Sequence, residues 1–515
     1  MPDAPASSPI LIVGAGPTGL VLALSLARRG VAFRIIDAED GPGEHSRAMG
    51  VQARTLEFYR QYGFADEVVR SGVIADQAHF RRRGPDGQEH EAATLRLRDA
   101  GQGVSPYPYL LAFPQDDHER LLIGKLEALR VHVEWKTKLI HFAEAADGIA
   151  VTLDKDGVSE PAHVQWLVGC DGARSIVRQI LGVGFTGGTY EQLFYVADVA
   201  IDGGFERDLY ANLGENGLAI MMPVRSSGMQ RLIGLIPRAL AGRKDLKFDD
   251  VRSDVEPLIG VKVTQVNWFS TYRVHHRVAA RFRVGRTFIA GDAGHIHSPV
   301  GGQGMNTGIG DAINLGWKLA DVVRGRASAV ILDTYEAERR PLAERLVATT
   351  DRAFDSIIAA GFKGRFIRNW LAPVVIGMAT HFASIRRRAF RAVSQTAISY
   401  PDSLLSEGRA GISGGERLPW IEGRNEDEDN FTPLQSLDWQ VHVYGEPEAG
   451  LAETCGRLGL ALHVRPWSAA TRDGGLRRNA TYLIRPDGYV GLASASGSAR
   501  RLESYVDRLG LRSVS

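Results

Sequence analysis

The hydrophobic pattern of the first 40 residues predicts a strand–helix–strand unit. The uninterrupted run ILIV, residues 10–13, is rich in β-branched side chains and ends at glycine, which is typical of a buried strand. Residues 17–28 then form an apolar stretch with Pro17 at its start and Gly30 past its end, as expected for a helix. The apolar run VAFRIID, residues 31–37, predicts the second strand.

Further along the chain, alternating and β-branched segments predict a strand-rich region. Strands are expected within 131–135, 148–157 and 162–172, with a turn at Asp156-Gly157. Many short strands are expected between about 190 and 282, and a buried strand, TFIAG, leads into residues 291–294. Helical periodicity dominates from about 311 to 396, and the remaining residues mix strands and helices, which suggests a small α/β domain of about 100 residues.

Composition narrows the class of protein. The chain has 515 residues, enough for about three domains of roughly 100–200 residues each. Its hydrophobic fraction of 44%, charged fraction of 23% and net charge of +1 are ordinary for a globular protein and favour neither a nucleic acid nor an anionic membrane as partner. Cys170 and Cys455 are the only cysteines, so we expect no disulfide framework and a reducing, cytoplasmic location.

Two apolar stretches do not predict a targeting or membrane segment. The first, which starts at Ile10, follows an N-terminus without a basic region and continues into a patterned helix, unlike a signal peptide. The second, residues 369–385, carries no Asp, Glu, Lys or Arg, but it is shorter than the roughly 20 residues of a spanning helix and contains Pro373. We therefore expect a packed helix there and no membrane insertion.

The first candidate site is the glycine motif between the first strand and helix. Gly14, Gly16 and Gly19 form a G-x-G-x-x-G pattern, in which Gly14 turns the chain, Gly16 admits a pyrophosphate and Gly19 lets helix and strand pack closely. Asp37 ends the second strand, 23 residues beyond Gly14, where a ribose-binding acid is expected. The motif fits NAD or the adenosine half of FAD, and a glycine turn without a ligand is the alternative.

Two later turns carry comparable chemistry. Asp171-Gly172 ends a strand and is followed by Arg174 and Arg178, although a plain turn with surface arginines explains this segment alone equally well. Asp292 follows the strand TFIAG, and the glycine-rich run 299–308 then opens a helix. Bare backbone N–H groups at such a helix start would stabilise negative charge, as on the N1–C2=O edge of a reduced flavin.

Together, these three motifs resemble the fingerprints of the FAD-dependent aromatic hydroxylases, single-component flavoprotein monooxygenases with the para-hydroxybenzoate hydroxylase fold. Residues 46–63 and 335–347 resemble further stretches of that family, and residues 480–493 resemble the thioredoxin-like C-terminal domain of phenol and polyketide hydroxylases. The resemblance implies an α/β fold with a Rossmann-like FAD-binding domain, an inserted mixed β-sheet substrate domain, a helical connection and a thioredoxin-like α/β domain. The corresponding ranges are 1–75, 105–184 and 283–360 for FAD; 76–104 and 185–282 for substrate; 361–401 for the connection; and 402–515 for the C-terminal domain.

The resemblance also implies roles for individual residues. The pyrophosphate would lie on Gly14, Gly16, Pro17, Thr18 and Gly19, with Arg47 nearby. Asp37, beside Ala38, would bind the adenosine ribose, and Asp171 would support cofactor binding and contact the pyridine nucleotide. The ribityl chain would meet Gln115 and Asp292, and the flavin ring would be lined by Pro299, Gly302, Gly304, Met305 and Asn306.

Residues for substrate and catalysis are less defined by sequence. The apolar face of the strand expected within residues 217–228 suits an aromatic ligand and offers Met221, Met222 and Pro223, but core packing explains each methionine as well. Arg225 is the candidate catalytic residue. Four histidines could act as bases or serve as structural groups: His275, His276, His295 and His297.

The expected activity follows from the resemblance. NAD(P)H, with NADPH favoured, would reduce FAD, and O₂ would form a flavin C4a-hydroperoxide that hydroxylates a phenolic or polycyclic aromatic substrate. A halogenase, an epoxidase, a Baeyer–Villiger oxygenase or a non-catalytic binding protein of the same fold is the alternative, although the sequence has no WxWxIP halogenase motif. No metal is expected, and a homodimer is an option. The C-terminal domain should be redox-inert, because Cys455 is its only cysteine and dithiol chemistry needs two.

Overall fold

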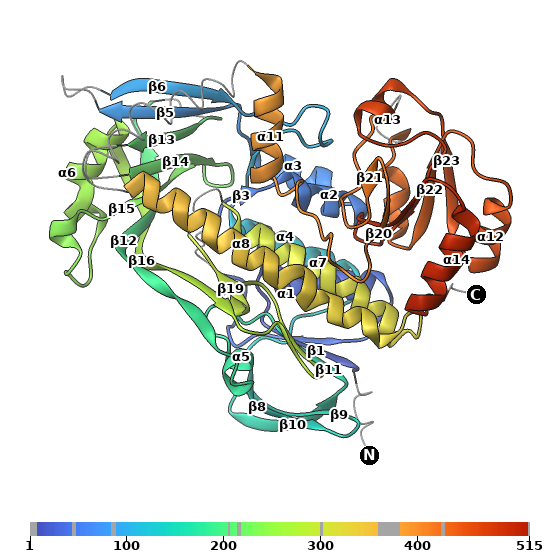
Figure 1. Ribbon diagram of the computed structural model, residues 1–515. Helices are drawn as coiled ribbons and strands as arrows, with labels where there is room; N and C mark the ends of the chain where they lie inside the picture. Colours follow the sequence, from blue (N-terminus) through green and yellow to red (C-terminus); the bar gives the residue numbers. More distant parts are fainter. Residues whose placement is uncertain are drawn as a thin grey trace.

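The computed structural model in Figure 1 describes residues 8–43, 48–83, 89–203, 207–213, 218–298, 302–358, 382–423 and 428–512. Arg47 and Pro299, both expected near the cofactor, lie outside these residues, as does most of the apolar stretch 369–385. The described elements form five sheets with helices packed around them, so the mixed α/β class expected from sequence is confirmed.

A five-stranded sheet contains the predicted strand–helix–strand unit: β1 (Ile10–Val13), α1 (Pro17–Arg28) and β2 (Arg34–Ile36). Its strand order is β17-β18-β11-β1-β2, and β1 runs parallel to β2 and β11. The remaining strands are β11 (Trp166–Gly169), β17 (Arg283–Val284) and β18 (Thr287–Ile289), with β18 parallel to β11. All three predicted motifs therefore follow the carboxyl ends of parallel neighbours and meet at one edge of this sheet.

An eight-stranded sheet is built mostly from the strand-rich middle of the chain, in the order β19-β16-β12-β15-β14-β13-β5-β6. Its strands are β5 (Gln77–Arg83), β6 (Glu89–Arg96), β12 (Phe185–Ile201), β13 (Leu209–Leu213), β14 (Leu218–Val224), β15 (Met229–Leu235), β16 (Val263–Ala279) and β19 (His295–Ile296). The expectation of short strands is wrong for β12 and β16, which have 17 residues each and pair antiparallel. Their long pairing is possible because register shifts at three points let the two strands bend together.

Helix α6 (Phe248–Ile259) interrupts the region predicted as strands throughout. Phe248, Val251, Val255 and Ile259 recur at helical spacing and are all buried, and left-handed Gly260 ends the helix. This periodicity was present in the sequence, so the helix was predictable.

Two smaller sheets flank the five-stranded one. The first has the order β10-β9-β8, from β8 (Thr137–Ala145), β9 (Gly148–Lys155) and β10 (Val158–Val164), with the predicted turn at Asp156-Gly157. The second joins β3 (Gly50–Val51), β7 (Leu111–Ala112) and β4 (Val73–Ile74). The strand predicted at 131–135 is wrong: only Glu134 makes a bridge, to Ile36, and the chain turns at left-handed Lys136.

Helices surround the sheets and connect them. They are α2 (Ala53–Gln61), α3 (Ala65–Ser71), α4 (Gln115–Ala128), α5 (Ile176–Ile180), α7 (Gly304–Val323), α8 (Asp333–Ile358) and α11 (Ala383–Val393). Helix α7 begins seven residues earlier than the periodicity suggested, because its first turns are formed by glycine and polar residues rather than by an apolar pattern. Figure 1 shows α8 crossing from the eight-stranded sheet toward the C-terminal part of the chain.

The C-terminal part forms a mixed six-stranded sheet in the order β21-β20-β25-β24-β22-β23. Its elements are β20 (Glu407–Ala410), β21 (Ile412–Ser413), β22 (Gln440–Tyr444), α12 (Leu451–Leu458), β23 (Ala461–Arg465), α13 (Ala469–Asp473), β24 (Thr481–Ile484), β25 (Val490–Ser494) and α14 (Ser498–Leu509). Cys455 is a free, buried thiol on α12, and burial raises its pKa to about 11. A protonated, buried thiol is unreactive, which agrees with a redox-inert domain.

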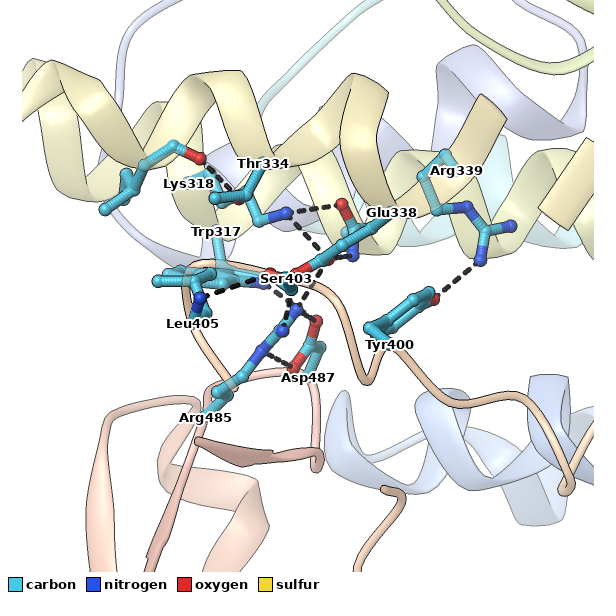
Figure 2. Close-up of polar contacts among 12 residues, drawn as sticks. Trp317, Lys318, Thr334, Glu338, Arg339, Tyr400, Ser403, Leu405, Arg485 and Asp487 are labelled. Atoms are coloured by element: carbon cyan, nitrogen blue, oxygen red, sulfur yellow. Dashed lines mark hydrogen bonds and ion pairs between the residues drawn. The ribbon is translucent and has the colours of Figure 1, made fainter. Parts of the chain in front are cut away.

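A buried ionic cluster joins the C-terminal sheet to α7 and α8 (Figure 2). Arg485, in the turn between β24 and β25, lies 2.7 Å from a carboxylate oxygen of Glu338 on α8 and 2.7 Å from one of Asp487. Lys318 on α7 lies 2.9 Å from Glu338, and the indole of Trp317 donates to Asp487. These charged side chains are almost fully buried, and their two positive and two negative charges balance.

The described helices include none that is long and apolar enough to cross a membrane.

Candidate functional site

The first glycine turn is fixed by close packing at two of its three glycines. Gly14 has φ +103°, and its N–H donates to the carbonyl of Ile36 at 2.8 Å. A side-chain carbon on Gly14 would overlap the carbonyl oxygen of Cys170, and one on Gly19 would overlap the carbonyl of Gly14. The sequence of this turn is therefore dictated by the approach of β11 and α1 to the loop.

Gly16 differs, because among the described residues no atom lies within 4 Å of its side-chain position. It is also the N-terminal cap of α1, where no side chain caps the helix and the first turn contains no acidic residue. The N–H groups of the helix start are therefore not paired within the helix, and the positive end of the helix dipole lies beside Gly16. Such a position is suited to a phosphate group, as expected for Gly16, Pro17 and Thr18.

Asp37, which follows β2, stabilises this turn through hydrogen bonds. One carboxylate oxygen accepts the N–H of Ala15 at 2.6 Å, and the other accepts the N–H of Glu39 at 2.9 Å. Each oxygen retains a further lone pair, so the carboxylate can also accept a sugar hydroxyl. Ala38 is exposed beside it.

The third motif packs directly onto the first. Gly291 has φ +61°, and a side-chain carbon there would lie 2.5 Å from the hydroxyl oxygen of Thr18. A side-chain carbon on Gly308, in α7, would overlap the same oxygen. Further along these helices, one on Gly316 would overlap the hydroxyl of Ser25. Small residues thus let α1 and α7 approach closely and bring their N-terminal ends to one site.

Buried Asp311 on α7 stabilises the Gly291 turn through hydrogen bonds. Its carboxylate accepts the N–H of Gly291 at 3.0 Å, Nε2 of His295 at 2.7 Å and Nε of Arg339 at 2.6 Å. The charge of Arg339 helps to keep the pKa of Asp311 below its usual range despite burial. Sequence reasoning missed Asp311 and Arg339, although both lie in stretches that carried the family resemblance.

Asp292, next to Gly291, has an exposed carboxylate at the end of β18. It lies in a 3-10 turn whose geometry is set by Gly291 and Asp311. Its contact with a ribityl hydroxyl stays a prediction.

The start of α7 presents bare backbone. Gly302 has φ +60°, and no atom of the described residues lies within 4 Å of its side-chain position. The nearest atom to the same position on Gly304 is Nε2 of His297, at 3.6 Å. Met305 is half-buried against the main core. The surface in front of these glycines can therefore admit a flat ring.

Asn306 was expected to line this ring, and its side chain is fully occupied within the protein. Its oxygen accepts the N–H of Gln52 at 2.9 Å and the hydroxyl of Thr55 at 2.8 Å. Its amide donates to the carbonyls of Gly50 and Gly302, both at 2.9 Å. Asn306 therefore shapes the glycine bed and fastens it to α2 and β3.

The second motif borders the same region. One oxygen of Asp171 accepts the N–H of Val177 at 3.2 Å, whereas the other is buried without a partner among the described residues. Burial raises the pKa of this carboxyl. Arg178 donates to the carbonyls of Ala293 and Ala173 at 2.7 and 2.8 Å, which ties the second motif to the third. Because this oxygen is buried, a contact between Asp171 and a ligand stays a prediction.

Gln115 begins α4, and its side-chain amide donates to Glu119 at 2.8 Å. Glu119 also accepts the N–H of Gly43 at 3.1 Å, and burial raises its pKa. The backbone N–H of Gln115 donates to the carbonyl of Ala48 at 3.1 Å. Gln115 therefore lies beside both flanks of the segment that contains Arg47.

The candidate histidines occupy different settings. His295 is fully buried and bound to Asp311, as a structural group would be. Nδ1 of His297 donates to the carbonyl of Ser298 at 2.7 Å, and burial lowers its pKa to about 4. His275 pairs with the hydroxyl of Thr189 at 2.7 Å, and His276 lies 3.7 Å from Asp351.

The candidate substrate residues on β14 point to opposite faces of the sheet. Met221 is completely buried in the core that α6 covers, whereas Met222 packs with Met49 and Ala112 on the other face. Met221 is therefore not included in the proposed substrate pocket. Pro223 and Arg225 line a cavity of about 430 Å³, between the end of α3 and β4 on one side and the β14–β15 turn on the other.

Comparisons with known proteins agree with this arrangement. A family model described as "FAD binding domain" matches residues 7–350. The chain is 34% identical over 558 residues to 6-methylpretetramide 4-monooxygenase of Streptomyces rimosus, which covers 99% of this chain and 95% of that protein. It is 32% identical over 434 residues to pentachlorophenol 4-monooxygenase of Sphingobium chlorophenolicum, with 82% and 77% covered. The solved structure of the anhydrotetracycline hydroxylase OxyS from Streptomyces rimosus matches with a TM-score of 0.78 and 26% identity, covering 98% of this chain and 99% of that one.

Proposed function

This chain belongs to the FAD binding domain family, and from that premise we propose that it is an FAD-dependent monooxygenase that hydroxylates a phenolic or polycyclic aromatic substrate. NADPH, or NADH in its place, is the proposed reductant, and O₂ supplies the oxygen atom. The two relatives named 6-methylpretetramide 4-monooxygenase and pentachlorophenol 4-monooxygenase, which cover 99% and 82% of this chain, support this reaction class.

The observation that carries the proposal is the meeting of two uncapped helix N-termini at Thr18. The start of α1 offers unpaired N–H groups beside the open space at Gly16, and the start of α7 offers bare glycine backbone at Gly302. Two separated clusters of N–H groups fit a ligand with two electron-rich parts, as in FAD, which has a pyrophosphate and a flavin ring. Asp37 and Asp292 are suited to its ribose and ribityl hydroxyls.

When bound, FAD would supply the capacity to accept a hydride and to activate O₂. The chain's own residues would bind and orient it: the α1 end neutralises phosphate charge, and the α7 end stabilises negative charge on the ring edge. The apolar face of β14 around Met222 would hold the aromatic ring and exclude water. His297 stays neutral at physiological pH, so Nε2 beside Gly304 can accept a hydrogen bond from a ligand.

A single experiment tests the cofactor assignment. The purified protein should be yellow and release FAD on denaturation, because no covalent attachment is expected. Asp292→Ala should weaken FAD retention by about tenfold, the loss of roughly one charge-assisted hydrogen bond. Exposed Asp473→Ala, on α13, is the matched control and should retain FAD. Undiminished FAD affinity in Asp292→Ala would refute the ribityl assignment, and a protein that binds no FAD would refute the proposal.

A further inference from the structure

We propose that the cavity beside β14 binds a carboxylate group carried by the aromatic substrate, with Arg207 and Arg225 as its ligands. This inference rests on the proposed function, because it takes the substrate to be aromatic. It adds a chemical requirement that neither the family nor the fold imposes: the substrate of this chain carries a negative charge away from the ring to be oxidised.

The walls of the cavity have two characters. The apolar part comes from α3, β4, β14 and the start of β15, through Val69, Val73, Ile74, Pro223, Val224 and Met229. The lining also contains three arginines, Arg98, Arg207 and Arg225. With a volume of about 430 Å³, the cavity lies within the usual range for small-molecule sites, roughly 300–1,000 Å³. Such a lining suits a flat apolar body with an anion at one end.

The charge of the cavity is unbalanced. Its lining contains no aspartate or glutamate among the described residues. Arg98 is paired with Asp76, and the backbone N–H of Asp76 donates to the carbonyl of Arg207. No described carboxylate pairs with the guanidinium of Arg207 or Arg225. On the turn side, Asp117 accepts hydrogen bonds from Ser226 and Arg120.

Arg225 is already oriented within the wall. Its Nη1 donates to the carbonyl of Gly72 at 3.1 Å, which fixes the guanidinium while leaving its other N–H groups unused by that contact. The planar fork of arginine matches the two oxygens of a carboxylate, and charge-assisted hydrogen bonds of this kind are among the stronger polar contacts. A carboxylate is therefore the group that this wall fits best.

The cavity lies next to the proposed flavin bed. Val224 lines the cavity and belongs to the same apolar cluster as Met49 and Met222. The residue after Met49, Gly50, accepts the side-chain amide of Asn306, which shapes the start of α7. The apolar cluster of Met49, Met222 and Val224 thus connects the cavity wall to the segment that Asn306 fastens to the glycine bed. In this proposal the substrate places its carboxylate in the cavity and an aromatic ring against the apolar cluster.

The test compares two matched probes, anthraquinone-2-carboxylate and anthraquinone-2-carboxamide, which have similar shape and differ in charge. Binding to the purified full-length protein is measured by titration calorimetry, which requires neither turnover nor a flavin signal. We expect the carboxylate to bind at least about tenfold more tightly than the amide, the equivalent of one net charge-assisted contact. Arg207→Ala and Arg225→Ala should each remove most of this preference without weakening the amide.

Arg96→Ala is the control, because Arg96 is an exposed arginine of β6 that does not line the cavity. It should leave both affinities unchanged, and Arg207→Lys should retain part of the preference. Equal binding of the two probes, binding of neither at millimolar concentration, or equal losses in Arg96→Ala and Arg207→Ala would overturn the inference. The readout is the heat of binding, so a protein that fails to oxygenate would still give a valid test of the carboxylate preference. Conversely, loss of the carboxylate preference would not contradict hydroxylation of neutral phenols.

Discussion

The hydroxyl of Thr18 lies only 2.5 Å from the place that a side-chain carbon on Gly291 would occupy. These two residues are 273 positions apart in the chain, and each belongs to a different glycine motif. Their contact shows that the two motifs form one continuous surface. Thr18 is the spacer between the N-terminal end of α1 and the turn before α7. Any group that enlarges this spacer should separate the two halves of the cofactor site.

Gly291→Ala should therefore lower FAD affinity strongly and destabilise the fold. The left-handed φ of +61° costs a non-glycine residue roughly 1 kcal/mol, and the overlap with Thr18 adds to this cost. Gly325→Ala is the matched control, because Gly325 has φ +67° at the end of α7 but open space around its side-chain position. Thermal unfolding and FAD titration of both variants would check this. Equal loss of FAD in the two would show that Thr18 has no part in the effect.

The contact between α1 and α7 predicts a compensating pair of substitutions. Gly308→Ala should weaken FAD binding and lower the unfolding temperature, because the added carbon overlaps the hydroxyl oxygen of Thr18. Thr18→Ala removes that oxygen, so the double variant should recover much of the stability lost by Gly308→Ala. A double-mutant cycle on unfolding free energy should give a coupling of about 0.5–3 kcal/mol. Strict additivity would contradict the packing described for these helices.

The ionic cluster between the C-terminal sheet and α8 gives a stability prediction. Arg485→Met leaves the buried charges of Glu338, Asp487 and Lys318 unbalanced, and removing one partner of a buried pair typically costs about 3–5 kcal/mol. Adding Asp487→Asn restores the charge balance and should recover part of that loss. Thermal unfolding of the two variants decides the matter. A double variant no more stable than Arg485→Met would mean that charge balance is not what stabilises this junction.

Buried His118 predicts a loss of stability in mild acid. Burial lowers the pKa of His118 to about 3, whereas an unfolded histidine has a pKa of about 6.5. Below the unfolded pKa the unfolded chain binds the additional proton, so stability present above about pH 6.5 falls as the pH drops, by at most about 1.4 kcal/mol per pH unit from this group.

His118→Gln should flatten this dependence. Glutamine cannot titrate, and its carbonyl oxygen can still accept the hydroxyl of Tyr59, which lies 2.6 Å from Nε2 of His118. Unfolding temperatures measured across mild acid for wild type, His118→Gln and the exposed control His141→Gln would test this. An unchanged slope in His118→Gln would assign the acid sensitivity to other groups.

Much of the fold could be predicted because its signals are local. The strand–helix–strand unit around Gly14 is encoded by a continuous apolar run, a proline at the helix start and glycine spacing, all within 37 residues. The three turns that meet at one sheet edge also carry recognisable residues. Helix α6 had a local signal too, and it was missed because its neighbours are strands. The expected domain boundaries stay a prediction.

The parts that could not be predicted depend on contacts between distant segments. No local sequence pattern indicates that Asp311 supports the Gly291 turn. The same is true of the hydrogen bonds that occupy the side chain of Asn306 with Gln52 and Gly50. The side of the sheet that Met221 faces is likewise set by where α6 packs. The residue that would help to ionise a phenol belongs to this class, since its role depends on the seated substrate.

The central claim, that this chain inserts oxygen from O₂ into an aromatic substrate, is tested most directly by isotope labelling. The FAD-loaded protein is supplied with NADPH and ¹⁸O₂, and a panel of phenolic and polycyclic aromatics, with and without a carboxylate, is assayed by mass spectrometry. We predict that at least one compound accelerates NADPH oxidation and gains a single oxygen atom that carries the ¹⁸O label. A hydroxylated product whose oxygen comes from water, or no oxygenated product from any compound despite bound FAD, would contradict the account.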